Sequence, residues 1–134
     1  MKKHIKELLA EGKYDEADAY LSENVTEENY DEDIAIFDGT IGLYYGDRER
    51  VWQACANGLT FNPRNYELYV ILGEYYLYTN INQAYLCYEN ALFFCQNEED
   101  KTLIVEVLDK LMQTGNVTVR KVSFVILSYN LLDY

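Results

Sequence analysis

The sequence has little histidine and cysteine, and both shortages exclude classes of protein. One histidine is present among the 134 residues, and this residue, His4, lies near the N-terminus. Zinc sites need clustered cysteine and histidine, commonly as Cys-x-x-Cys pairs, and no such pair occurs, so we expect no metal site. The three cysteines are odd in number, which favours buried, reduced thiols over a disulfide framework.

A long hydrophobic run and a basic stripe are also missing. No segment reaches the roughly 18 apolar residues of a membrane-spanning helix, and the N-terminus lacks the apolar core of a signal peptide. We therefore expect a cytoplasmic protein without a membrane span. The formal net charge is −12, and an acidic surface without a basic patch argues against nucleic acid and anionic membranes as partners.

Catalytic motifs are missing as well. The sequence contains no phosphate-binding loop, no nucleophile elbow and no His-Glu metal motif. The acidic run at residues 30–33 lacks the glycine and the spaced oxygen ligands of a calcium loop, and we interpret it as the acidic start of a helix. No acid, base and nucleophile converge, so we expect a chain that is not an enzyme and holds no cofactor.

What the sequence does contain is an apolar composition rich in tyrosine. Hydrophobic residues make up 49% of the chain, and fourteen residues are tyrosine. Tyrosine joins a large apolar body to a polar tip, which suits half-exposed seams between helices and surfaces that contact partners. The length is typical of one domain with a hydrophobic core.

Glycines recur at a fixed interval. Gly39 and Gly73 are 34 residues apart, and Gly12, Gly46 and Asn80 form a second series with the same interval. Asn80 would replace a turn glycine there, because asparagine tolerates the left-handed backbone conformation. Two independent series with one period indicate a repeated helical hairpin.

The residues around these glycines resemble the tetratricopeptide repeat. The stretch YVILGEYY at 69–76 is similar to its first helix, and AYLCYENA at 84–91 is similar to its second. Small residues let two helices cross closely, and a large aromatic fills the space beside them. The resemblance covers about residues 5–97 and implies an all-α solenoid of helical hairpins with about seven helices, in a domain that spans residues 1–115.

Residues 99–115 predict one more amphipathic helix. Leu103, Val107, Leu108 and Leu111 share one face, and the acidic residues at its start suit a helix N-terminus. A stack of repeats leaves one apolar face uncovered, so we expect this helix to cap the stack.

The repeat register predicts a groove lined by the first helix of each hairpin. Its mixture of tyrosines and acids would suit a protein or peptide with basic and apolar side chains. The alternative is that several of these positions only pack against neighbouring helices or against a catalytic domain. The predicted groove residues are Asp33, Ile36, Thr40, Leu43, Tyr44, Glu67, Val70, Glu74, Leu77 and Tyr78.

The end of the sequence has a different character. Residues 121–130 are dense in β-branched and apolar side chains, which predicts a buried β-strand. The sequence VSFVILSYNLLDY at 122–134 is similar to the opening strand of family-2 glycosyltransferases. This resemblance implies an interdomain linker at 116–121, followed by the first strand of a truncated α/β catalytic domain. By the same resemblance, Ser128 and Tyr129 would lie at the nucleotide base.

The glycosyltransferase resemblance implies a longer parent protein that uses a nucleotide sugar and a divalent metal. The acidic metal motif of that family, two aspartates around one residue, does not follow the strand. We therefore expect a non-catalytic module that binds a protein, a peptide or its own downstream catalytic domain. The alternative is a free-standing adaptor whose C-terminal strand pairs with a second copy to form a homodimer.

Overall fold

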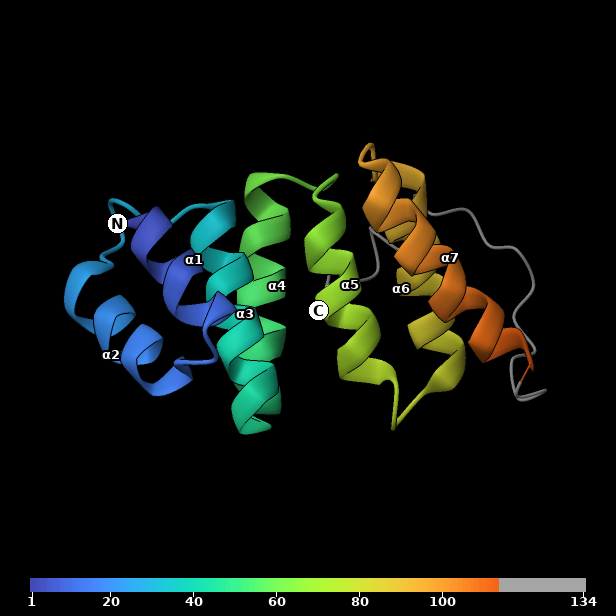
Figure 1. The fold of residues 1–134 in the computed structure, drawn as a ribbon, viewed down its shortest axis with the longest axis horizontal. Helices are drawn as coiled ribbons and strands as arrows, with labels where there is room; N and C mark the ends of the chain where they lie inside the picture. Colours follow the sequence, from blue (N-terminus) through green and yellow to red (C-terminus); the bar gives the residue numbers. More distant parts are fainter. Residues whose placement is uncertain (114–134) are drawn as a thin grey trace.

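The structure is a computed structural model that describes residues 1–113. Seven α-helices follow one another in this part of the chain, and none of its residues forms a strand (Figure 1). The helices are α1 Lys2–Ala10, α2 Tyr14–Asn24, α3 Glu32–Tyr45, α4 Arg48–Phe61, α5 Tyr66–Tyr76, α6 Ile81–Phe94 and α7 Glu98–Gln113. For residues 1–113 the all-α prediction is confirmed. The predicted linker, the strand at 122–134, and Ser128 and Tyr129 lie outside the described residues.

The helices pack as hairpins that stack along the long axis of the molecule (Figure 1). Helices α1 and α2 form the first hairpin, α3 and α4 the second, and α5 and α6 the third, while α7 lies against α6. First helices also contact one another, α1 with α3 and α3 with α5. The stack therefore brings side chains from different hairpins to a shared surface.

Side-chain caps at the helix starts repeat along the chain. Asp31 and Asn65, which are 34 residues apart, accept hydrogen bonds from backbone N–H groups in the first turns of α3 and α5. Asp47 and Asn80 do the same for α4 and α6, and Asn97 accepts a hydrogen bond at the start of α7. Each such cap typically contributes about 1 kcal/mol. The caps thus carry the same repeat as the glycines.

The prediction of a left-handed turn at Asn80 is wrong. Gly12 and Gly46 do have positive φ angles, 73° and 68°, but the φ of Asn80 is −152°. The turn after α5 closes through backbone hydrogen bonds from Thr79 and Asn80 to the carbonyl of Tyr76. Because the backbone turns without a left-handed residue, the Asn80 side chain is free to cap α6.

Two glycines mark the places where helices cross most closely. A Cβ atom on Gly73 would lie 2.6 Å from the ring of Tyr88, and one on Gly58 would lie 2.6 Å from Leu68. Any larger residue would force these neighbours to move. The requirement for close packing explains why glycine stands inside helices, where it is otherwise unfavourable.

The buried apolar residues form two clusters. The larger cluster joins α3 to α7, and the smaller one joins α1, α2 and α3. Cys55, Cys87 and Cys95 are buried without disulfide bonds, as predicted. Burial raises the pKa of the Cys55 and Cys87 thiols well above the usual range, so these thiols stay protonated and inert while the protein is folded.

Helix α7 covers the end of the stack with a different face from the predicted one. Its buried residues are Ile104, Leu108 and Leu111, whereas Leu103 is 58% exposed. The spacing of 104, 108 and 111 is that of a helical stripe. Apolar residues stand side by side at 103 and 104, so the sequence pattern fits either face, and packing against α6 selects the second.

Candidate binding groove

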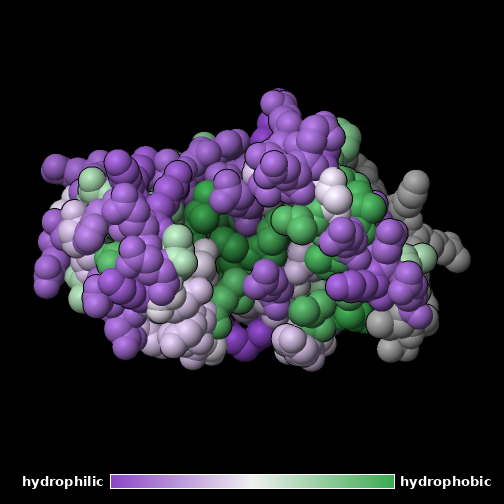
Figure 2. All heavy atoms as spheres, viewed as in Figure 1, coloured by the Kyte–Doolittle hydropathy of each residue, from purple (hydrophilic) through white to green (hydrophobic). Residues whose placement is uncertain are grey.

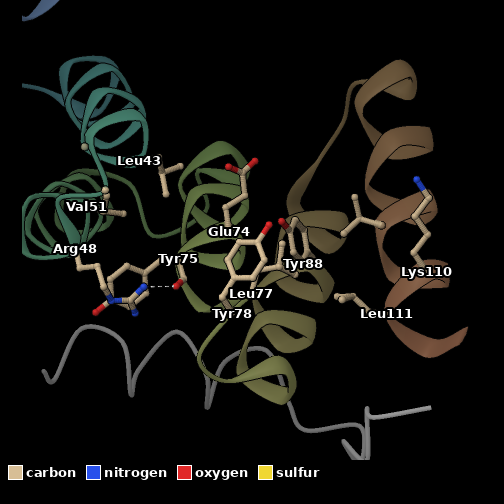
Figure 3. Close-up of a pocket in the computed structure, with 13 residues that line it drawn as sticks. Leu43, Arg48, Val51, Glu74, Tyr75, Leu77, Tyr78, Tyr88, Lys110 and Leu111 are labelled. Carbon is tan, nitrogen blue, oxygen red and sulfur yellow. Dashed lines mark hydrogen bonds between the residues drawn. The ribbon is translucent and has the colours of Figure 1, made fainter. Parts of the chain in front are cut away.

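A groove runs along α5 between α3 and α7. It consists of two cavities, of about 370 Å³ and about 620 Å³, and both are lined by Leu43 and Glu74. Figure 2 shows hydrophobic side chains gathered in a hollow at the centre of the face seen in Figure 1, with hydrophilic side chains around it. The second cavity is drawn in Figure 3.

Most of the predicted groove residues lie in this groove. Those in the first cavity are Ile36, Thr40, Leu43, Glu67, Val70 and Glu74. Leu77 and Tyr78 line the second cavity, together with Leu43 and Glu74 (Figure 3). The structure thus brings together side chains that the register of the repeat assigned to one surface.

Two predicted residues, Asp33 and Tyr44, line neither cavity. Asp33 accepts a hydrogen bond of 2.8 Å from the Lys2 ammonium group. The Tyr44 ring stacks on the ring of Tyr14, with 4.0 Å between centroids. Both side chains instead face the preceding hairpin, because α3 has neighbours on two sides. A register shared by all repeats does not distinguish these sides.

The sequence analysis missed the contribution of α7. Asp100, Leu103 and Ile104 line the first cavity, and Val107 and Lys110 line the second. The prediction treated this helix only as a cap. A signal was present, because the interval of 33 to 34 residues that links the acids at 33 and 67 continues to Asp100.

The groove floor is apolar and its rim carries exposed apolar side chains. Ile36, Leu43 and Val70 are partly buried on the floor. At the rim, Leu103 is 58% exposed and Tyr78 is 91% exposed. Exposed apolar side chains beside an apolar hollow are typical of a surface that contacts another molecule.

Acidic side chains stand among these apolar residues. Glu67 and Glu74 reach solvent, yet the groove walls partly desolvate their carboxyl groups and raise the pKa of both. For Glu67, the negative charge of Asp100 acts in the same direction. None of the ion pairs within residues 1–113 involves Glu67 or Glu74. Desolvated carboxylates without a cation raise the free energy of the unbound protein.

The far end of the groove has the opposite charge. Lys110 of α7 and Arg48 of α4 line the second cavity (Figure 3). The Arg48 guanidinium lies 3.9 Å from the centroid of the Tyr75 ring and donates a hydrogen bond of 2.9 Å to the Tyr75 carbonyl. Acids therefore occupy one end and the middle of the groove, and cations occupy the other end.

The described residues do not form a catalytic or metal centre in this groove. Neither cavity has a cysteine, histidine or serine among its described lining residues. Within residues 1–113, no three histidine, cysteine or acidic side chains lie close enough to hold a metal ion. Over the same range, no helix has the length and apolar character needed to cross a membrane. The side chains at hand are those of a binding surface.

Comparison with known proteins assigns no function to the groove. No family model matches the chain, and the searches of curated proteins and of solved structures gave no match. The resemblances to the tetratricopeptide repeat and to glycosyltransferases therefore rest on the residues quoted above. The function has to be inferred from the chemistry of the groove.

Proposed function

We propose that this chain is a non-catalytic, cytoplasmic module of the tetratricopeptide type that binds a protein segment in the groove along α5. The observation that carries the proposal is the combination of an apolar floor with the unpaired acids Glu67 and Glu74. Apolar pockets with a few well-placed polar groups are the usual form of a binding site. The partner is a protein or peptide with basic and apolar side chains.

The way the groove is built also supports this proposal. Its walls come from α3, α5 and α7, which belong to successive units of the stack. Capped helices on a shared apolar core hold these walls in place before a ligand arrives. A preformed site gives affinity because little conformational entropy is lost on binding.

A peptide-display selection on the full chain tests the proposal. We expect enriched peptides whose binding is lost in Val70→Arg, because the larger side chain fills the floor and places its guanidinium between Glu67 and Glu74. Glu89→Gln on α6 is the control, since this residue does not line the groove. Circular dichroism checks that both variants are folded. Peptides that bind wild type and Val70→Arg equally would contradict the proposal.

We also propose that the module belongs to a family-2 glycosyltransferase and contacts its catalytic domain. The support is the similarity of residues 122–134 to the first strand of that family. The parent would use a nucleotide sugar and a divalent metal, with Ser128 and Tyr129 at the base. The coding sequence after residue 134 tests this proposal. An acidic metal motif should follow within about a hundred residues, one domain length, and its absence would sink the idea.

The second candidate is a free-standing adaptor that pairs through its C-terminal segment. The apolar character of residues 122–134 favours this candidate, since an unpaired apolar strand promotes association. Light scattering on the full chain and on a version ending at Gly115 separates the candidates. A dimer that survives removal of the segment rules out pairing through the strand.

A further inference from the structure

We infer that the ligand of the groove is a basic amphipathic helix that lies along α5 and carries two cationic side chains seven residues apart, with apolar side chains between them. This inference rests on the proposed function and specifies its ligand. Its basis is the order of side chains along one face of α5, which alternates acid, apolar pair and acid.

The register of α5 sets the spacing of the ligand. Glu67, Val70, Ile71 and Glu74 all line the first cavity, and their spacing of i, i+3, i+4 and i+7 places them on one helical face. With a rise of 1.5 Å per residue, the two acids stand about 10.5 Å apart along the axis.

A helix aligned with α5 matches this spacing residue for residue. Its side chains at i and i+7 reach the two acids, and those at i+3 and i+4 meet Val70 and Ile71. An extended strand presents same-face side chains roughly every 6.6 Å. A strand therefore cannot place two cations on the acids and keep its apolar residues on the floor.

The walls of the groove suit a helix as well. Ile36 and Leu43 from α3 stand on one side, and Leu103 and Ile104 from α7 stand on the other. A helix seated between them would cover the exposed Leu103 side chain and complete a layer of helices. Recognition of an amphipathic helix in an apolar groove is a common mode of protein binding.

Charge complementarity selects a basic helix and limits the number of its cations. Glu67 and Glu74 are free of ion pairs within residues 1–113, and a ligand ammonium or guanidinium group would supply charge-assisted hydrogen bonds to them. Beyond Glu74 the groove turns cationic at Lys110 and Arg48. A third cation on that side would be repelled, which adds specificity.

The test uses the full chain and a labelled helical peptide of about 18 residues in fluorescence anisotropy. The peptide has lysine at i and i+7 and leucine at i+3 and i+4. Its control has the same composition, with the lysines moved to the opposite face. We expect the control to bind at least tenfold more weakly. We expect the double variant Glu67→Gln/Glu74→Gln to bind the first peptide at least tenfold more weakly, and Glu89→Gln to bind it as wild type does.

The outcomes separate this inference from the proposed function. Equal binding of the two peptides, or unchanged binding by the double variant, overturns the basic helix. The peptides selected by display still test the groove itself through Val70→Arg. A full chain that dimerises, and dissociates in Val70→Arg, would make a second copy the occupant and would also overturn the inference. Gln has nearly the shape of Glu, so circular dichroism should show the double variant folded.

Discussion

The first hairpin, α1–α2, and the stack from α3 to α7 are held together in different ways. The stack packs through a continuous apolar cluster in which Tyr69 is fully buried and Gly58 and Gly73 allow helices to cross closely. Its helices α3, α4 and α6 have 14 residues each, whereas α1 has 9 and α2 has 11. Short helices with a small core depend more on their neighbours.

Polar contacts do much of the work at the seam between the first hairpin and the rest. The Arg50 guanidinium on α4 donates hydrogen bonds of 2.6 Å to Asp18 on α2 and 2.7 Å to Asp38 on α3. Lys2 forms ion pairs with Asp31 and Asp33. Partly exposed ion pairs contribute little and are screened by salt. The comparison teaches that the first hairpin docks on a core that the rest of the stack forms, and that it should open first.

The largest expected effect comes from Tyr69→Ala in the stack. Removing a fully buried aromatic side chain should lower the free energy of unfolding by about 3–5 kcal/mol. Labelling of the buried thiols of Cys55 and Cys87 reports this opening, because both lie in the same cluster. Leu8→Ala on α1 is the comparison, and it should accelerate hydrogen exchange in α1 and α2 and leave thiol labelling nearly unchanged. Equal labelling in the two variants would contradict the division into two regions.

Gly58→Ala should have the next largest effect. The added methyl group would lie 2.6 Å from Leu68 and 2.7 Å from Ala35, and such overpacking costs about 1–3 kcal/mol, which outweighs the helix propensity gained, about 1 kcal/mol. Gly12→Ala meets no atom within 4 Å but carries a positive φ, so it should cost about 1 kcal/mol through backbone strain alone. Urea unfolding measures both variants. A Gly58→Ala protein as stable as wild type would show that the helices do not need this close crossing.

The sequence predicted those features that depend on local spacing. The glycine intervals predicted hairpins, and the same register placed Ile36, Val70 and Glu74 on the surface where the structure has them. Such periodicity is a property of single helices and their repeat, so it survives without knowledge of neighbours.

Features that depend on competing neighbours could not be predicted. Asn80 can either adopt a left-handed conformation or cap a helix, and the backbone closure of the turn decides between them. Leu103 and Ile104 offer α7 two possible faces, and contact with α6 decides. Tyr44 turns to Tyr14 because the first hairpin stacks there. In each case a contact between distant parts of the chain selects one of two locally acceptable structures.

Arg50→Met should weaken the seam and leave the stack intact. The variant keeps much of the apolar stem but leaves Asp18 and Asp38 without their cation, which should cost about 1–2 kcal/mol. Native-state hydrogen exchange should become faster in α1 and α2, while the thiols of Cys55 and Cys87 stay protected. Arg64→Met is the control, because this exposed residue has no ion pair within the described part of the chain. Faster thiol labelling in Arg50→Met would show that the seam also supports the stack.

The smallest expected effect is that of Glu74→Gln, and it should stabilise the protein. Desolvation raises the pKa of Glu74 above its ordinary value of 4.5, so the folded protein binds more protons than the unfolded chain as the pH rises from that value. The free energy of unfolding therefore falls across this window, and the loss persists at pH 7. Glu74→Gln removes that loss and should raise the free energy of unfolding at pH 7 by about 0.5 kcal/mol or less.

Urea unfolding at pH 7 and at pH 3.5 tests the sign of this effect. The difference between Glu74→Gln and wild type should be present at pH 7 and vanish at pH 3.5, where the wild-type carboxyl group is protonated in both states. Glu89→Gln should show no such pH-dependent difference. A destabilised Glu74→Gln protein at pH 7 would give this acid a role in holding the stack. Higher stability together with weaker peptide binding would mean that the groove retains a destabilising charge because its ligand requires it.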